Sequence, residues 1–160
     1  MCFTGNFALT MMLEPAVRAP VLSQPSLPLD DPAGLEISSA DLAAVRQRLE
    51  RDDLTVLVNR FAGDRFFKAE RFAAYAAALG DRFVARVLPD SAANYESLAP
   101  FFRQVVASPH RVVTAHLIDQ AGQPTIAARD QILAFFALRL AAQEWLRPAP
   151  DAMLSAIAGR

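Results

Sequence analysis

The chain has 160 residues, of which 53% are hydrophobic and 21% charged, and 16 basic and 17 acidic residues give a formal net charge of −1. This composition supports one hydrophobic core and argues against a disordered chain. The near-neutral balance, without blocks of like charge, argues against nucleic acid and anionic membrane as partners.

Targeting signals are not evident, and the sequence predicts a soluble, cytoplasmic protein. No stretch approaches the ~20 apolar residues of a membrane span. The apolar residues before Glu14 lack the preceding basic residue of a signal peptide. A single cysteine, Cys2, excludes an intrachain disulfide. A lone cysteine is usually a small buried hydrophobe, and this interpretation stays open beside a reactive one.

The first third of the chain predicts a helix, a short strand and a second helix. Residues 3–13 have almost no polar face, so we expect a helix that is buried on nearly all sides. A short strand begins near residue 19 and gives way to a proline-rich loop. Residues 39–50 have apolar residues at helical spacing, with Ser39 as the expected N-cap.

The middle of the chain predicts two strands that flank a helix. Residues 54–61 form a near-continuous apolar run, as buried parallel strands do. Residues 70–79 form an alanine-rich helix that Gly80 closes. Residues 82–88 alternate as a further strand. This alternation of strands and helices predicts an α/β fold with a mostly parallel sheet and flanking helices.

The last third predicts a short helix at residues 101–106 and a strand or extended segment at residues 112–119. A long final helix begins at Pro124, which suits a first helical turn. Its expected apolar stripe comprises Ile126, Leu133, Phe136 and Leu140. We expect residues 1–147 to form the domain and residues 148–160 a loosely held tail.

Three side chains suggest a catalytic constellation. Cys2 stands at a helix start, where the helix dipole favours the thiolate. Asp64 follows a strand, on the rim where α/β sheets place their sites. His110 lies in a loop after a later strand and would bridge the two by taking the thiol proton. Nucleophile, acid and histidine occur in the order of the α/β-hydrolase triad.

The segments around these residues resemble the dienelactone hydrolase family. Met1-Cys2-Phe3-Thr4-Gly5 is similar to that family's nucleophile elbow, in which cysteine replaces serine. Phe61-Ala62-Gly63-Asp64 resembles its strand-to-acid turn, and Ser108-Pro109-His110 its histidine loop. The elbow's preceding glycine would lie before Met1, Gly5 stands one position late, and Arg111 replaces a small residue.

The resemblance covers residues 1–140 and implies a hydrolase of esters or lactones that needs no cofactor. Cys2 would attack the carbonyl carbon, His110 would act as base and then acid, and Asp64 would orient the imidazole. The backbone N–H of Phe3 would donate to the oxyanion. The expected partner is a small-molecule ester or lactone, and no metal-ligand spacing appears.

Each assignment has a plain alternative. Asp64 could be a turn residue and His110 a loop residue without a role. Asp90 also follows a strand and is the rival acid, although no glycine turn precedes it. His116 is interpreted as a packing residue and is the substitute base. Ser23, Ser26 and Ser91 lack elbow context and are interpreted as solvated hydroxyls.

The resemblance also implies a partial α/β-hydrolase fold, because the strands that normally precede the elbow are missing. An apolar sheet edge would then be exposed, and a second chain or copy is the expected cover. The loop that donates a second oxyanion N–H would be missing too. A truncated, non-catalytic remnant or interaction module is therefore the alternative function. An unrelated small α/β domain with an inert Cys2 is the third interpretation.

Overall fold

The structure is a computed structural model that describes residues 1–96 and 98–144. Within these ranges, three strands and five α-helices alternate in an α/β order, with short 3-10 turns between them. The strands are β1 (Val21–Ser23), β2 (Val56–Phe61) and β3 (Phe83–Leu88). The helices are α1 (Phe7–Thr10), α2 (Ser39–Arg51), α3 (Ala69–Leu79), α4 (Pro100–Val105) and α5 (Pro124–Glu144).

The strands form one parallel sheet in the order β1-β2-β3. Leu22 pairs with Val58 and Val58 with Ala85, so the three strands run in register through β2. All six residues of β2 are buried. Parallel strands need their faces covered, and the apolar run of β2 meets that need. The predicted α/β class with a parallel sheet is confirmed.

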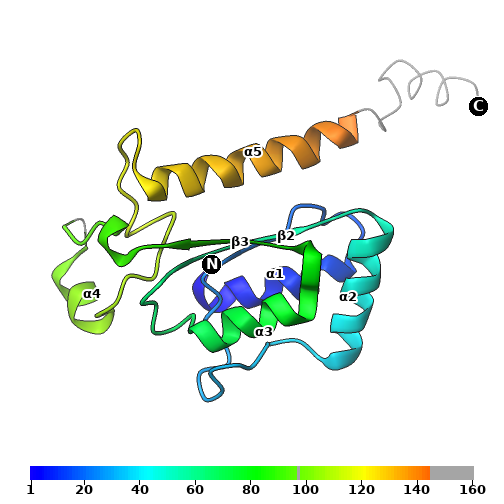
Figure 1. The fold of residues 1–160 in the computed structure, drawn as a ribbon, viewed down its shortest axis with the longest axis horizontal. Helices are drawn as coiled ribbons and strands as arrows, with labels where there is room; N and C mark the ends of the chain where they lie inside the picture. Colours follow the sequence, from blue (N-terminus) through cyan, green and yellow to red (C-terminus); the bar gives the residue numbers. More distant parts are fainter. Residues whose placement is uncertain (97, 145–160) are drawn as a thin grey trace, which may run out of the picture.

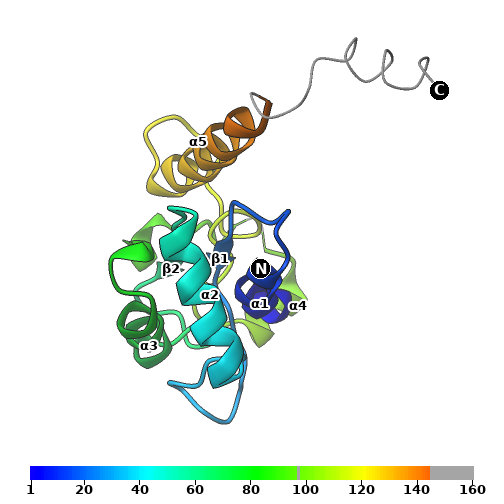
Figure 2. The same ribbon diagram turned by 90° about the vertical axis from the view of Figure 1, so that its right-hand side faces the viewer.

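Helices cover both faces of this sheet. Figures 1 and 2 show α1, α2 and α3 on one face and α5 alone on the other. The larger core lies under the three helices and includes Leu22, Val58 and Leu49. A smaller core surrounds Phe61 and includes Ala128 of α5. Figure 1 places α4 beyond the end at which β3 stops.

The N-terminal helix runs as the 3-10 turn Cys2–Asn6, then α1, then the 3-10 turn Met11–Leu13. Its predicted burial on nearly all sides is wrong. Leu9 and Met12 are buried against the sheet, whereas Phe3, Phe7 and Met11 are about half exposed, at 52%, 48% and 57%. The sheet covers only one side of the helix. An apolar sequence favours burial, but it does not ensure that a second layer packs on the other side.

Two further predictions of local structure need correction. Residues 112–116 form consecutive turns rather than a strand, because the His116 N–H donates to the Arg111 carbonyl at 3.0 Å, and residues 117–119 have no regular secondary structure. The N-cap of α2 is Ser38, one residue earlier than predicted, and its hydroxyl accepts from the Asp41 N–H at 3.0 Å.

The predicted stripe of α5 is only partly the buried face. Ile126 is buried together with Ala128 and Ile132, whereas Leu133 is 56% exposed. The predicted tail, residues 148–160, lies outside the described residues. No helix in the described ranges is long and apolar enough to cross a membrane.

Two buried arginines hold the loops that surround the first helices. Arg48 of α2 donates to the carbonyls of Met12, Glu14, Pro15 and Val17. Arg71 of α3 donates to the carbonyls of Pro28, Asp31, Gly34 and Phe66. The two arginines thus donate hydrogen bonds to backbone carbonyls outside the α-helices and strands. Buried backbone carbonyls need such partners.

Candidate active site

Asp64 lies in a tight turn directly after β2. The turn closes through the Asp64 N–H, which donates to the Phe61 carbonyl at 3.3 Å. One carboxylate oxygen, Oδ1, accepts from the backbone N–H groups of Phe66 and Phe67 at 2.9 and 3.0 Å. The residue is only 3% exposed. These backbone donors hold the carboxylate in place independently of any side-chain contact.

Asp90, the rival acid, supports this turn from outside. Its Oδ1 accepts from the Gly63 N–H at 2.8 Å. A Cβ atom on Gly63 would clash with Asp90 Oδ2, so a larger residue there would require Asp90 or the turn to shift. The aspartates therefore have different contacts: Asp90 binds the backbone of the turn, and Asp64 binds a histidine.

That histidine is His110, whose Nδ1 lies 2.8 Å from Asp64 Oδ2 and 3.0 Å from Oδ1. The His110 loop is joined to the acid turn a second time, because Ser108 Oγ accepts from the Arg65 N–H at 3.2 Å. The Phe66 ring packs against the imidazole with centroids 5.1 Å apart. Both members of the ion pair are buried, with side chains 3% and 0% exposed.

The pair is arranged to favour a charged imidazole. Burial alone would lower the pKa of His110, but the hydrogen bond and charge of Asp64, with a smaller contribution from Cys2, outweigh it. The pKa of His110 is therefore raised above its ordinary value. Nδ1 is engaged by Asp64, while Nε2 is buried without a hydrogen-bond partner among the described residues. Nε2 is thus the atom available for proton transfer.

Cys2 opens the first 3-10 turn in a strained conformation. Its φ is +55°, in the left-handed region that residues with a side chain rarely adopt. Such strain occurs at functional positions and is a feature of nucleophile elbows. Its Sγ lies 3.6 Å from Ser26 Oγ, in the loop after β1. Gly5 lets the turn pack on that loop, since a Cβ there would lie 3.2 Å from the Ser23 carbonyl oxygen.

The thiol of Cys2 is polarised toward the thiolate. Partial burial opposes ionisation, but contacts with His110, Ser26 and the backbone of Phe3 together outweigh it and lower the pKa of Cys2. His110 and Cys2 therefore shift each other toward an imidazolium–thiolate pair. Their hydrogen bond is not formed within normal geometry, as is common for catalytic contacts before substrate binds.

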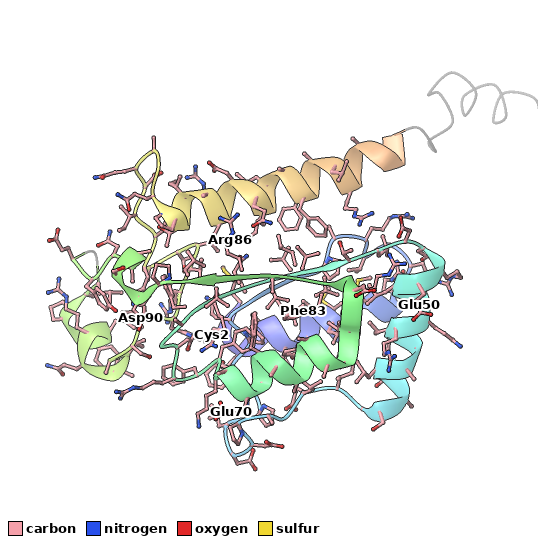
Figure 3. All side chains as sticks on the ribbon, viewed as in Figure 1. Cys2, Glu50, Glu70, Phe83, Arg86 and Asp90 are labelled. Carbon is pink, nitrogen blue, oxygen red and sulfur yellow. The ribbon has the colours of Figure 1, made fainter. Side chains whose placement is uncertain are left out.

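A hollow of about 340 Å³ opens at the thiol and is lined by Met1, Cys2, Gln24, Arg111 and Thr114. Figure 3 shows Cys2 on the α1 side of the sheet, toward the end that carries Asp90. A hollow of about 400 Å³ between α2 and the end of α3 is lined by no cysteine, serine or threonine. Glu50, which lines that second hollow, lies at the opposite end of the molecule in Figure 3.

The structure thus brings Cys2, Asp64 and His110 together, and it places two further side chains that sequence reasoning missed. Ser26 and Gln24 were expected neither at the site nor buried, yet each is 1% exposed. Their signal would have been their place in the loop after β1, at the edge that also carries Asp64. Ser23 is buried too, so only Ser91 fits the expected solvated hydroxyl.

Comparison with models of protein families, with curated proteins and with solved structures finds no match. Among the described residues, no three histidine, cysteine, aspartate or glutamate side chains gather as a metal site would require. The case for a function therefore depends on the geometry of this site.

Proposed function

We propose that the chain is a cysteine hydrolase of the dienelactone hydrolase type, which cleaves an ester or lactone with Cys2, His110 and Asp64. The observation that carries the proposal is the buried His110 imidazole. Its Nδ1 binds Asp64 at 2.8 Å, while its Nε2 has no described hydrogen-bond partner and Cys2 lies nearby. A histidine held by an acid on one nitrogen is oriented to exchange a proton on the other.

The order and placement of these residues support the proposal. Cys2, Asp64 and His110 follow the α/β-hydrolase order of nucleophile, acid and histidine. Asp64 follows the carboxyl end of β2, and His110 follows the next strand, β3. Parallel sheets place their sites at this edge. A partial α/β-hydrolase fold is part of the same proposal.

In the proposed reaction, the Cys2 thiolate attacks the carbonyl carbon and a C–S bond forms. The negative charge moves to the carbonyl oxygen, where the N–H of Phe3 donates, being the residue after the nucleophile. The C–O bond then breaks, and the leaving oxygen takes the proton from His110 Nε2. Water next gives its proton to His110 and attacks the thioester, which releases the acid and restores Cys2.

Trapping the acyl group tests this proposal. The protein is mixed with p-nitrophenyl acetate, quenched in acid and analysed by peptide mass spectrometry. We expect an acetyl group on Cys2 and a burst of p-nitrophenol that both disappear in Cys2→Ala. His110→Ala should slow acylation by about 10²-fold, the usual range for a lost general base. Acylation of wild type no faster than that of a free thiol would contradict the proposal.

The second candidate is a non-catalytic interaction module, and one observation favours it. Phe3, Phe7 and Met11 are three large apolar side chains of the N-terminal helix, and each is about half exposed. Large apolar side chains that gather on an exposed surface mark an interaction site. Sedimentation of wild type and Phe7→Glu separates the candidates, because an association that this change abolishes would support the module.

A further inference from the structure

His116 lies six residues after His110 and is completely buried. It does not bind Asp64 in the described contacts, so it does not replace His110 as the base. Instead, its Nδ1 accepts from the backbone N–H of Arg111 at 3.1 Å and, over a longer 3.5 Å, from that of His110. The His116 side chain is thus hydrogen-bonded to the backbone at His110, the proposed base.

The backbone of His116 completes this attachment. Its N–H donates to the Arg111 carbonyl at 3.0 Å, so His116 satisfies both polar backbone groups of Arg111. The His116 carbonyl accepts from the Asn94 N–H at 2.9 Å. The His110 loop is therefore tied, through one residue, to the segment that follows β3.

The surroundings of His116 suit an acceptor that stays neutral. The rings of Phe61 and Tyr95 meet its imidazole edge-to-face, with centroids 6.0 and 5.7 Å away. Burial lowers the pKa of His116, and the charges of His110 and Arg111 lower it further against the opposing effect of Asp64. A neutral ring whose Nδ1 accepts carries its proton on Nε2.

We propose that His116 is a positioning residue that holds the backbone of the base, His110, in register with Asp64 through its Nδ1 acceptor. The inference rests on the proposed function for the role of His110. It goes beyond that function by assigning the second histidine to the geometry of the first. Without the acceptor, the Arg111 and His110 N–H groups lose their partner and the loop shifts.

Two substitutions at His116 distinguish the role of its Nδ1 acceptor from the role of its aromatic ring in packing. His116→Phe keeps an aromatic ring and removes the acceptor, whereas His116→Asn loses the ring and keeps an oxygen near the position of Nδ1. The chain has two histidines, so in either variant His110 gives the only histidine signal. The pKa of His110 is then read from its proton NMR titration, and thermal melting reports whether each variant folds.

We expect His116→Phe to lower the pKa of His110 toward its ordinary value of ~6.5 and His116→Asn to keep it near the wild-type value. Alkylation of Cys2 at pH 6 should fall at least about threefold in His116→Phe, as a half-unit rise in thiol pKa implies. A folded His116→Phe protein with the wild-type His110 titration would overturn the proposal.

The NMR readout is independent of hydrolysis. If acyl trapping on Cys2 fails while His116→Phe still lowers the pKa of His110, the proposed function fails and the positioning role stands. If His116→Phe does not melt cooperatively, His116→Leu gives the same comparison, because it also lacks an acceptor and is smaller. Equal loss in His116→Phe and His116→Asn would show that packing acts and the acceptor does not.

Discussion

At the scale of single residues, the site depends on the effect of Asp64 on the pKa of His110 and on the mutual effect of His110 and Cys2. Asp64 stabilises the charged form of His110, and His110 in turn stabilises the Cys2 thiolate. Two of the three are fully enclosed, and the thiol is partly accessible. Reactive cysteines require this combination of a lowered pKa and access.

Removing His110 should raise the pKa of Cys2. In His110→Ala, the thiol loses the neighbouring imidazole and its positive charge, while the opposing effect of burial remains. We expect alkylation by iodoacetamide at pH 6 to slow by about tenfold for each unit of the rise. The pH dependence of the alkylation rate measures the shift. A matched His116→Asn protein should keep the wild-type profile, and an unchanged profile in His110→Ala would refute the coupling.

Replacing Asp64 should lower the stability of the folded protein, and the loss should be larger at low pH than at high pH. The folded pKa of His110 is raised, so the contribution of the pair is complete below the unfolded pKa and is lost as pH rises through the folded value. Asp64→Asn keeps an oxygen for the N–H groups of Phe66 and Phe67 but removes the charge. We expect a loss of about 1.5–3 kcal/mol at pH 5.5 that shrinks by pH 8.5.

That comparison is best made by thermal melting in a Cys2→Ala background, because the pKa of the thiol is itself coupled to His110. The lowered pKa of Cys2 has the opposite sign, since its contribution is present above the unfolded value and lost as pH falls through the folded value. A loss that is the same at both pH values would mean that Asp64 acts through hydrogen bonds to its own turn.

At the scale of elements, the acid turn after β2 depends on a close approach to the end of β3. Gly63→Ala would place a Cβ 2.1 Å from Asp90 Oδ2, so the turn or Asp90 must move. Overpacking of this kind costs about 1–3 kcal/mol. We expect a lower melting temperature and a lower pKa of His110, because Asp64 is the adjoining residue.

A double-mutant cycle checks the cause of that effect. Asp90→Ala removes the carboxylate that Gly63→Ala would meet, so the double variant should lose less than the sum of the two single variants. Simple additivity would indicate that the contact with Asp90 does not cause the loss.

At the scale of the whole molecule, two buried guanidinium groups join separate segments to the helical layer. Arg48 binds four carbonyls between residues 12 and 17, at the end of the helix that begins with Cys2 and in the segment after it. Arg48→Met would leave these carbonyls without their donor, and a buried acceptor left unpaired costs about 1–3 kcal/mol. We expect a much lower midpoint in urea.

Arg51→Met is the matched control, because Arg51 lies on the same helix and is exposed. Its described side-chain partner is Asp52, at 2.8 Å. Exposed pairs of this kind contribute little, so we expect a change within about 0.5 kcal/mol. Equal losses in the two variants would show that charge on α2, rather than the buried carbonyl contacts, determines stability.

The sequence by itself determined the class of the fold and the identity of the candidate triad. The apolar run of β2, the alternation of strands and helices and the glycine that closes α3 are local signals, and each gave an element in the right place. Cys2, Asp64 and His110 were selected by residue type and by position after predicted elements. The packing of Asp64 against His110 follows from the shared edge of neighbouring parallel strands.

Only the tertiary structure decided which apolar surfaces are buried and which contacts each of the two histidines makes. The apolar sequence of the N-terminal helix favours burial on all sides. The sheet covers only one of its sides, so Phe7 stays exposed. His110 and His116 have the same side chain six residues apart, and their roles differ because one meets a carboxylate and the other meets backbone N–H groups. Contacts between segments distant in sequence set these differences, and no local pattern encodes them.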